Sequence, residues 1–183
     1  MDHMLPAPRS LRLGAQVLAA ALLTPLAIGL LASAGGAGDW ARHELPLSFD
    51  PTRARPGDVA ALWLHNLRAV ALPLLGAAAL SGLSRTAGSW RTARALLDAL
   101  LLVSGAANLL MLAVSIAGYG PVRMARWLPH LPFEFAALAA AVAAYLLARR
   151  APLRAAQLAR TAATAVALLG VAAVLETYGV PHR

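Results

Sequence analysis

The chain has 183 residues, of which 60% are hydrophobic and only 13% are charged, and its mean hydropathy is +0.65. A soluble domain carries about a quarter of its residues as charged side chains, so this composition excludes an ordinary soluble protein and indicates a membrane protein. The formal net charge is +8, but the arginines are spread between apolar runs, which argues against a nucleic-acid interface. The absence of cysteine excludes disulfides, thiolate metal sites and cysteine nucleophiles.

Five apolar segments are long enough to cross a bilayer as helices. The expected spans are about 13–33, 59–83, 95–118, 128–148 and 161–180. The expected fold class is therefore all-α: a polytopic integral membrane helical bundle of about five transmembrane helices. Residues 1–183 are expected to form a single membrane domain.

Two of the expected spans contain residues that predict further structural features. The first follows Arg9 and Arg12, as the apolar part of a signal peptide does, but residues 13–38 exceed the about 7–15 residues of a cleavable segment. We therefore expect a retained span, with a kink at Pro25. In the second span, the small residues Gly76-Ala77-Ala78-Ala79 predict close helix packing.

The distribution of arginine predicts the orientation. Five spans place the two termini on opposite sides of the membrane. With the N-terminus in the cytoplasm, the cytoplasmic segments hold nine arginines and the opposite segments hold six. Because cytoplasmic loops carry the excess of Arg and Lys, we expect a multi-pass protein of the cell membrane with its N-terminus inside and its C-terminus outside.

Several polar side chains lie inside or at the ends of the apolar segments. They are His65, Asn66, Arg68, Asn108, His130, Glu134 and Glu176. Alternation of the spans places all of them except Asn108 in one leaflet, the outer one in this orientation. His130 and Glu134 are four residues apart and share a helix face. A further acid, Asp98, is expected to pair locally with Arg94, four residues earlier.

Two interpretations of this polar set stay open. An unpaired ionised side chain in a span costs roughly 2.5–3.5 kcal/mol, and pairing Arg68 with Glu134 or Glu176 would lower this cost and fix the helix packing. Alternatively, the set forms a functional polar pocket or a partner site, which intramembrane ionisable residues usually mark. Asn66 and Asn108 can also form hydrogen bonds between helices.

Enzyme motifs are weak in this chain. His130, Glu134, His65 and Glu176 have the residue types of a metal site, but no His-Glu-x-x-His motif is present, and no serine lies in a Gly-x-Ser-x-Gly context. We therefore assign no catalytic residue, no metal ligand and no cofactor, and expect a protein that is not an enzyme. An intramembrane metal-dependent enzyme is the least favoured alternative.

Three polar segments occur in order between residues 59 and 181. They are His65-Asn66-Leu67-Arg68, Pro129-His130-Leu131-Pro132-Phe133-Glu134 and Leu175-Glu176-Thr177-Tyr178-Gly179-Val180-Pro181. Together they resemble the stage II sporulation protein M family, which has an Asn-Leu-Arg-type segment, a Pro-His-Gly-x-x-Glu motif and a late Glu before a Thr-Pro-like stop. The resemblance covers roughly residues 59–181, and Asn108 is similar to the family's mid-chain Asn. Leu131 stands where the family usually has Gly, and His65 where it often has a second Asn.

This resemblance implies a non-enzymatic membrane anchor or scaffold of a cell-envelope complex. The family's sporulation member is a membrane anchor for two peptidoglycan hydrolases, stage II sporulation proteins D and P, so a peptidoglycan hydrolase is an expected partner besides the lipid bilayer. The alternative is the membrane subunit of a transporter. Because the chain has no Gly-x-x-x-x-Gly-Lys-[Ser/Thr] loop, such a transporter would need a separate ATPase subunit.

Overall fold

The computed structural model of the protein describes residues 7–44, 55–83 and 88–179. These residues form helices and no strand. The helices are α1 (Ala7–Ala34), α2 (Gly38–Glu44), α3 (Pro56–Gly82), α4 (Gly88–Tyr119), α5 (Pro121–Trp127), α6 (Leu131–Ala148) and α7 (Ala155–Tyr178). Five of these described helices contain segments long and apolar enough to cross a membrane: Arg12–Ala34, Pro56–Gly82, Trp90–Tyr119, Leu131–Ala148 and Ala155–Tyr178. The predicted all-α, five-span architecture is thus confirmed.

The helix boundaries differ from the predicted spans: α1, α3, α4 and α7 begin three to seven residues earlier than expected, and α6 begins later. Helix α4 begins at Gly88, whereas residues 84–94 were expected to form a loop. Helix α6 begins at Leu131 rather than at residue 128, and the chain before it, Pro121–Trp127, forms the separate short helix α5. Pro121 and Pro132 each lie at the start of a helix, where a proline removes no helical hydrogen bond. The short helix α2 lies within the expected first loop.

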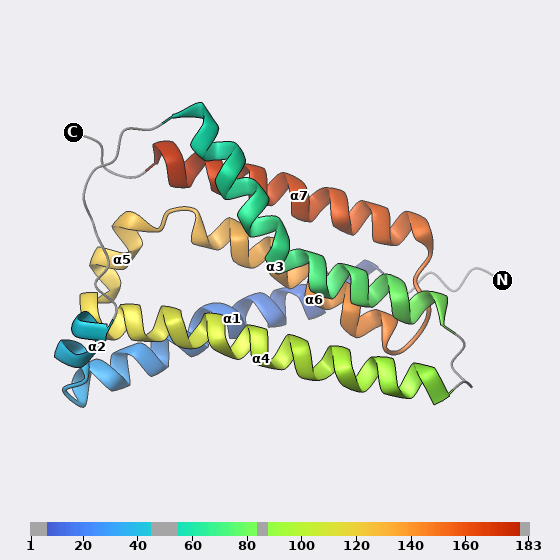
Figure 1. The fold of residues 1–183 in the computed structure, drawn as a ribbon, viewed down its shortest axis with the longest axis horizontal. Coiled ribbons are helices and arrows are strands. Elements are labelled where there is room, and N and C mark those ends of the chain that lie inside the picture. Colours follow the sequence, from blue (N-terminus) through green and yellow to red (C-terminus); the bar gives the residue numbers. More distant parts are fainter. Residues whose placement is uncertain (1–6, 45–54, 84–87, 180–183) are drawn as a thin grey trace.

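The long helices run alternately in opposite directions (Figure 1). Helix α6 packs against α1, α3 and α7, and α1 also packs against α4. The short helices α2 and α5 lie at one end of the bundle, which we call the α5 end, and α3 and α6 begin and α7 ends there (Figure 1). Helix α1 begins at the opposite end. This alternation matches the predicted topology, in which the first and last spans start and finish on different sides.

Small residues let the helices approach closely. The buried Gly76 of α3 lies against the ring of Tyr145 in α6, and a Cβ atom at Gly76 would lie 3.1 Å from Tyr145 Cδ2. Ala77 is also fully buried, so the close packing predicted for this stretch is confirmed at these two positions. Prolines 25 and 73 are buried inside α1 and α3, and α3 is visibly bent (Figure 1). A proline within a helix removes one backbone hydrogen bond and produces such a bend.

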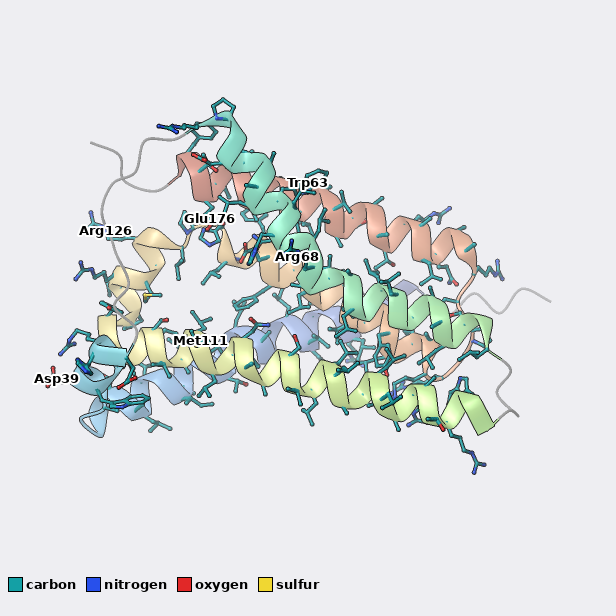
Figure 2. All side chains as sticks on the ribbon, in the orientation of Figure 1. Asp39, Trp63, Arg68, Met111, Arg126 and Glu176 are labelled. Carbon is teal, nitrogen blue, oxygen red and sulfur yellow. The ribbon has the colours of Figure 1, made fainter. Side chains whose placement is uncertain are left out.

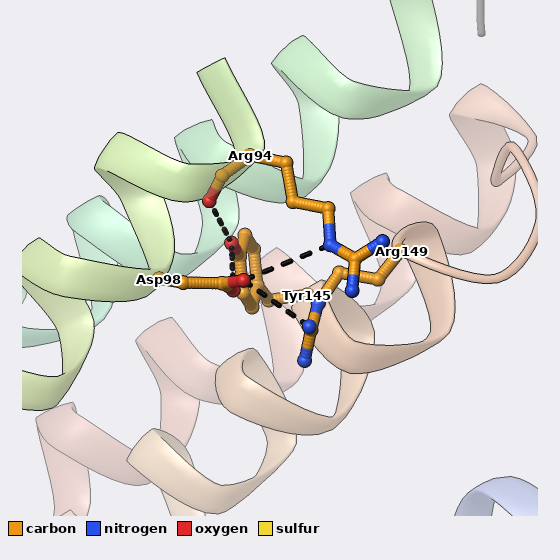
Figure 3. A network of polar contacts seen from close by, with 4 residues as sticks. All are labelled: Arg94, Asp98, Tyr145 and Arg149. Carbon is orange, nitrogen blue, oxygen red and sulfur yellow. Dashed lines mark hydrogen bonds and ion pairs between the residues drawn. The ribbon is translucent and has the colours of Figure 1, made fainter. Parts of the chain in front are cut away.

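A polar network joins α4 to α6 at the end of the bundle opposite α5 (Figure 3). The predicted pair is present, with Arg94 Nε 3.7 Å from Asp98 Oδ2. Asp98 also receives a hydrogen bond of 2.7 Å from the Tyr145 hydroxyl and pairs with Arg149, whose Nη2 atom lies 3.1 Å from Asp98 Oδ2. Asp98 therefore connects α4 with the C-terminal end of α6, rather than forming only a local pair. Its contacts with Tyr145 and Arg149 were not predicted from the sequence.

The closest helix contact provides a test of the packing. A Cβ atom at Gly29 of α1 would lie 2.7 Å from the Ala113 carbonyl oxygen and 2.7 Å from Ile116 Cβ, both on α4. We expect Gly29→Ala to force these helices apart and to reduce stability by about 1–3 kcal/mol, as overpacking does. Thermal unfolding in detergent measures the effect. Gly14→Ala, on the same helix with no atom within 4 Å of the added Cβ, is the control. Equal melting of both variants and the wild type would show that α1 and α4 are not in close contact.

Candidate functional site

Polar side chains from three helices meet near the α5 end of the bundle. Helix α3 supplies Asn66, helix α6 supplies Glu134 and helix α7 supplies Glu176. His130 is the residue immediately before α6. We call these four residues the Glu134 cluster. Figure 2 labels Glu176 of this cluster, together with Arg68 and Trp63 of α3. All four residues belong to the set that the sequence analysis placed in one leaflet.

Packing beneath the cluster holds the three helices together. Val70 of α3 contacts a buried group formed by Ala137 and Ala141 of α6 and Ala165 and Leu169 of α7. The alanines leave little volume between the helix backbones, so the three helices approach closely. Such contacts drive helix association in lipid, where no hydrophobic effect between helices operates.

One side-chain hydrogen bond reinforces this packing. The Trp63 indole N–H of α3 donates to the Val166 carbonyl of α7 over 3.2 Å. Buried Trp N–H groups require such a partner, and this contact fixes the first half of α3 against α7. The positions of Asn66 and Glu176 therefore follow from apolar packing and this one bond.

The two carboxylates occupy opposite helix ends. Glu134 lies in the first turn of α6, where the helix dipole favours a negative charge. Glu176 lies two residues before the end of α7, where the dipole disfavours a negative charge. Glu176 therefore depends more on a neighbouring positive group, and the exposed His65 of α3 lies near enough to interact with it electrostatically.

Within the cluster, the Glu134 side chain accepts a hydrogen bond, whereas the Nδ1 atom of His130 has no hydrogen-bond partner in the described ranges. The Asn66 side-chain amide donates a hydrogen bond to Glu134 Oε1. His130 is 5% exposed; its Nε2 atom lies 4.0 Å from Glu176 Oε2, and its Nδ1 atom has no hydrogen-bond partner among the described residues. One ligand atom from each of His130, Glu134 and Glu176 lies within 4.8 Å of the other two. The cluster thus concentrates two acids and one imidazole.

The predicted ion pair of Arg68 with Glu134 or Glu176 is not formed. Arg68 is exposed and makes no ion pair or hydrogen bond with another described residue, and Asn66 occupies the position beside Glu134. The reason is helical geometry. Successive residues turn by about 100°, so two residues of separation point Arg68 away from α6 when Asn66 points towards it.

Asn108 lies outside the cluster. Its side-chain amide donates to the Ser104 carbonyl of its own helix α4 over 3.0 Å, and the side chain is exposed. Of the two asparagines expected to bond between helices, Asn66 does so and Asn108 does not. Chemically, the described cluster provides oxygen and nitrogen ligands for a positively charged group, or a place to hold a proton.

The hydrogen bond between Asn66 and Glu134 gives a direct test of the cluster. Asn66→Ala leaves the half-buried Glu134 carboxylate without its donor, so we expect a loss of about 1–3 kcal/mol in stability. Arg68→Ala should leave the thermal unfolding temperature in detergent unchanged, because Arg68 bonds to no described residue. Equal destabilisation by both substitutions would contradict this arrangement and would support an ion pair between Arg68 and one of the acids.

Comparison with known proteins provides no relative. No protein-family model, no curated protein and no solved structure matches this chain. The resemblance to the stage II sporulation protein M family therefore depends on the three polar segments alone and stays a prediction. The function has to be argued from the geometry of the site.

Proposed function

We propose that this protein is a non-enzymatic, multi-pass membrane protein that anchors a partner protein of the cell envelope. The observation that carries the proposal is the position of Arg68. It lies within the membrane-spanning part of α3, it is exposed, and no described residue pairs with it. A cation in this position costs free energy in lipid, and an acidic or polar group from a neighbouring protein lowers that cost.

The surface around Arg68 has the composition of a helix interface in a membrane. Leu64 and Leu75 are four residues before and seven residues after Arg68, spacings that place all three on one helix face. Leu64 is 58% exposed and Leu75 is 69% exposed. We call Leu64, Arg68 and Leu75 the Arg68 face. One charge in an apolar stripe gives a partner helix both contact area and a specific register.

The resemblance in the sequence supports the same proposal. The three segments that resemble the stage II sporulation protein M family contribute Asn66, His130, Glu134 and Glu176 to one cluster, and Arg68 lies two residues from Asn66. Val180 and Pro181 of the third segment lie outside the described residues. If the resemblance holds, a peptidoglycan hydrolase is the expected partner of the Arg68 face.

The transporter alternative has less support. A groove of about 560 Å³ lies between α1, α6 and α7, and its lining includes Gly14, Ala140 and Arg160. None of the residues of the Glu134 cluster lines this groove. This groove therefore does not support a substrate path through the cluster. The partner experiment below tests the transport function as the alternative.

We also propose that the α5 end faces outwards and that the protein lies in the cell membrane. The arginines of the opposite end, including Arg91, Arg94, Arg149 and Arg150, support this orientation because Arg accumulates on the cytoplasmic side.

Single-cysteine labelling tests this orientation, because the chain contains no cysteine of its own. We expect a membrane-impermeant maleimide to label Gly57→Cys, in the first turn of α3, in intact cells and to label Gly88→Cys, at the start of α4, only after lysis. Neither added Cβ meets another atom within 4 Å. The reverse pattern would invert the orientation.

In vivo photo-crosslinking tests the partner proposal. A photo-reactive amino acid at position 64 is expected to give one discrete adduct with an envelope protein, and Arg68→Ala should reduce its yield at least several-fold. The same amino acid at Leu102, which is 73% exposed on α4, is the control and should not give this adduct. Mass spectrometry of the adduct separates the alternatives. A peptidoglycan hydrolase supports the anchor, a nucleotide-binding subunit supports the transporter, and crosslinks to lipid alone contradict the proposed partner surface.

A further inference from the structure

We propose that His130, Glu134 and Glu176 bind one divalent transition-metal ion, of the type of Zn²⁺, at the α5 end of the bundle. This inference concerns the interior of the bundle and does not depend on the partner proposed for the Arg68 face. The three side chains come from α6, its preceding turn and α7, so a metal ion there would connect the start of one helix with the end of another.

The distances between the ligand atoms are close to those of a metal site. One nitrogen or oxygen atom of each residue lies within 4.8 Å of the other two. Zinc binds His nitrogen and carboxylate oxygen at about 2.0–2.2 Å, which places neighbouring ligand atoms roughly 3–4 Å apart. Rotation of the two flexible glutamate side chains would close this difference.

The charges of the cluster favour a dication. Two carboxylates lie together, and Glu176 is also at the unfavourable end of a helix dipole. The arginine nearest in sequence to the cluster on α3, Arg68, points away and pairs with neither acid. A divalent ion neutralises both carboxylates at once, whereas the hydrogen bond from Asn66 neutralises neither.

The imidazole of His130 gives a second, independent indication. Its Nδ1 atom is buried and has no hydrogen-bond partner in the described part of the chain, and its Nε2 atom is 4.0 Å from Glu176, beyond hydrogen-bond distance. Buried polar atoms in native proteins almost always have a partner. A metal ion bonded to one of these nitrogens gives the ring a strong interaction that the described side chains do not provide.

The types of ligand atom indicate which metal ions the site would bind, and Asn66 would orient one of the ligands. One imidazole with two carboxylates suits Zn²⁺, Mn²⁺ or Fe²⁺ better than Mg²⁺ or Ca²⁺, which prefer oxygen ligands alone. Asn66 bonds to Glu134 and would orient it from outside the coordination shell, as residues behind metal ligands commonly do. Three protein ligands leave a fourth position for water or for a group of a bound molecule.

Direct metal binding tests this inference. The full chain, purified in detergent with a tag that contains no histidine and after chelation, is titrated with Zn²⁺ alone by calorimetry, and bound zinc is measured by mass spectrometry. We expect one Zn²⁺ per chain and a rise in the melting temperature. Co²⁺ should give the visible absorption of a four-coordinate site. Glu134→Gln and Glu176→Gln, which preserve side-chain shape, should each weaken binding at least tenfold.

Matched controls separate this site from adventitious binding. His43 and Glu44 are exposed residues of α2, and His43→Ala and Glu44→Gln should bind Zn²⁺ as the wild type does. His130→Ala should lose binding, and circular dichroism should show whether it keeps its helices. The inference is overturned if the wild type binds neither Zn²⁺ nor Mn²⁺, or if both glutamine variants retain wild-type affinity. Either result would leave a proton shared between the two carboxylates as the explanation of the cluster, and would not affect the crosslinking result at position 64.

Discussion

Close packing of small residues is the constraint on which the rest of the structure depends. Lipid chains are as apolar as the helices, so burial of apolar surface does not hold the spans together. Instead, Gly76 admits the Tyr145 ring, and the alanines of α6 allow α3 and α7 to approach. That approach brings Asn66 and Glu176 to Glu134. A larger residue at a position such as Ala137 would separate the helices and disperse the cluster without changing any polar group.

The half-buried acids at the two ends of the bundle have different surroundings. Asp98 is surrounded by Arg94, Arg149 and the Tyr145 hydroxyl, so its charge is neutralised within the chain. Glu134 and Glu176 have only an amide and imidazoles near them. The first arrangement has a complete set of partners and is explained as a structural tie between α4 and α6. The second leaves two neighbouring acids without an arginine partner among the described residues, which is why we place function there.

Much of this fold was predictable because long apolar runs have few alternatives to a membrane-spanning helix. The shared end of His130, Glu134 and Glu176 was predictable for the same reason, since alternating spans fix which ends meet. The partner of Glu134 was not, because it depends on how α3 is rotated about its axis, and a single sequence contains no measure of that rotation. Tyr145 and Arg149 were missed as partners of Asp98 because they are remote in sequence and lie in α6 and immediately after it.

The unequal lengths of the helices have a consequence for the membrane itself. Helix α6 has 18 residues and α4 has 32, which correspond to about 27 Å and about 48 Å. The first matches a hydrocarbon layer of about 30 Å, whereas the second exceeds it. Both helices share one bilayer only if α4 tilts or extends beyond it, and the packing of α4 against its neighbours limits how far it can tilt. A thicker bilayer would leave α6 too short, and the protein should therefore concentrate in thinner membranes.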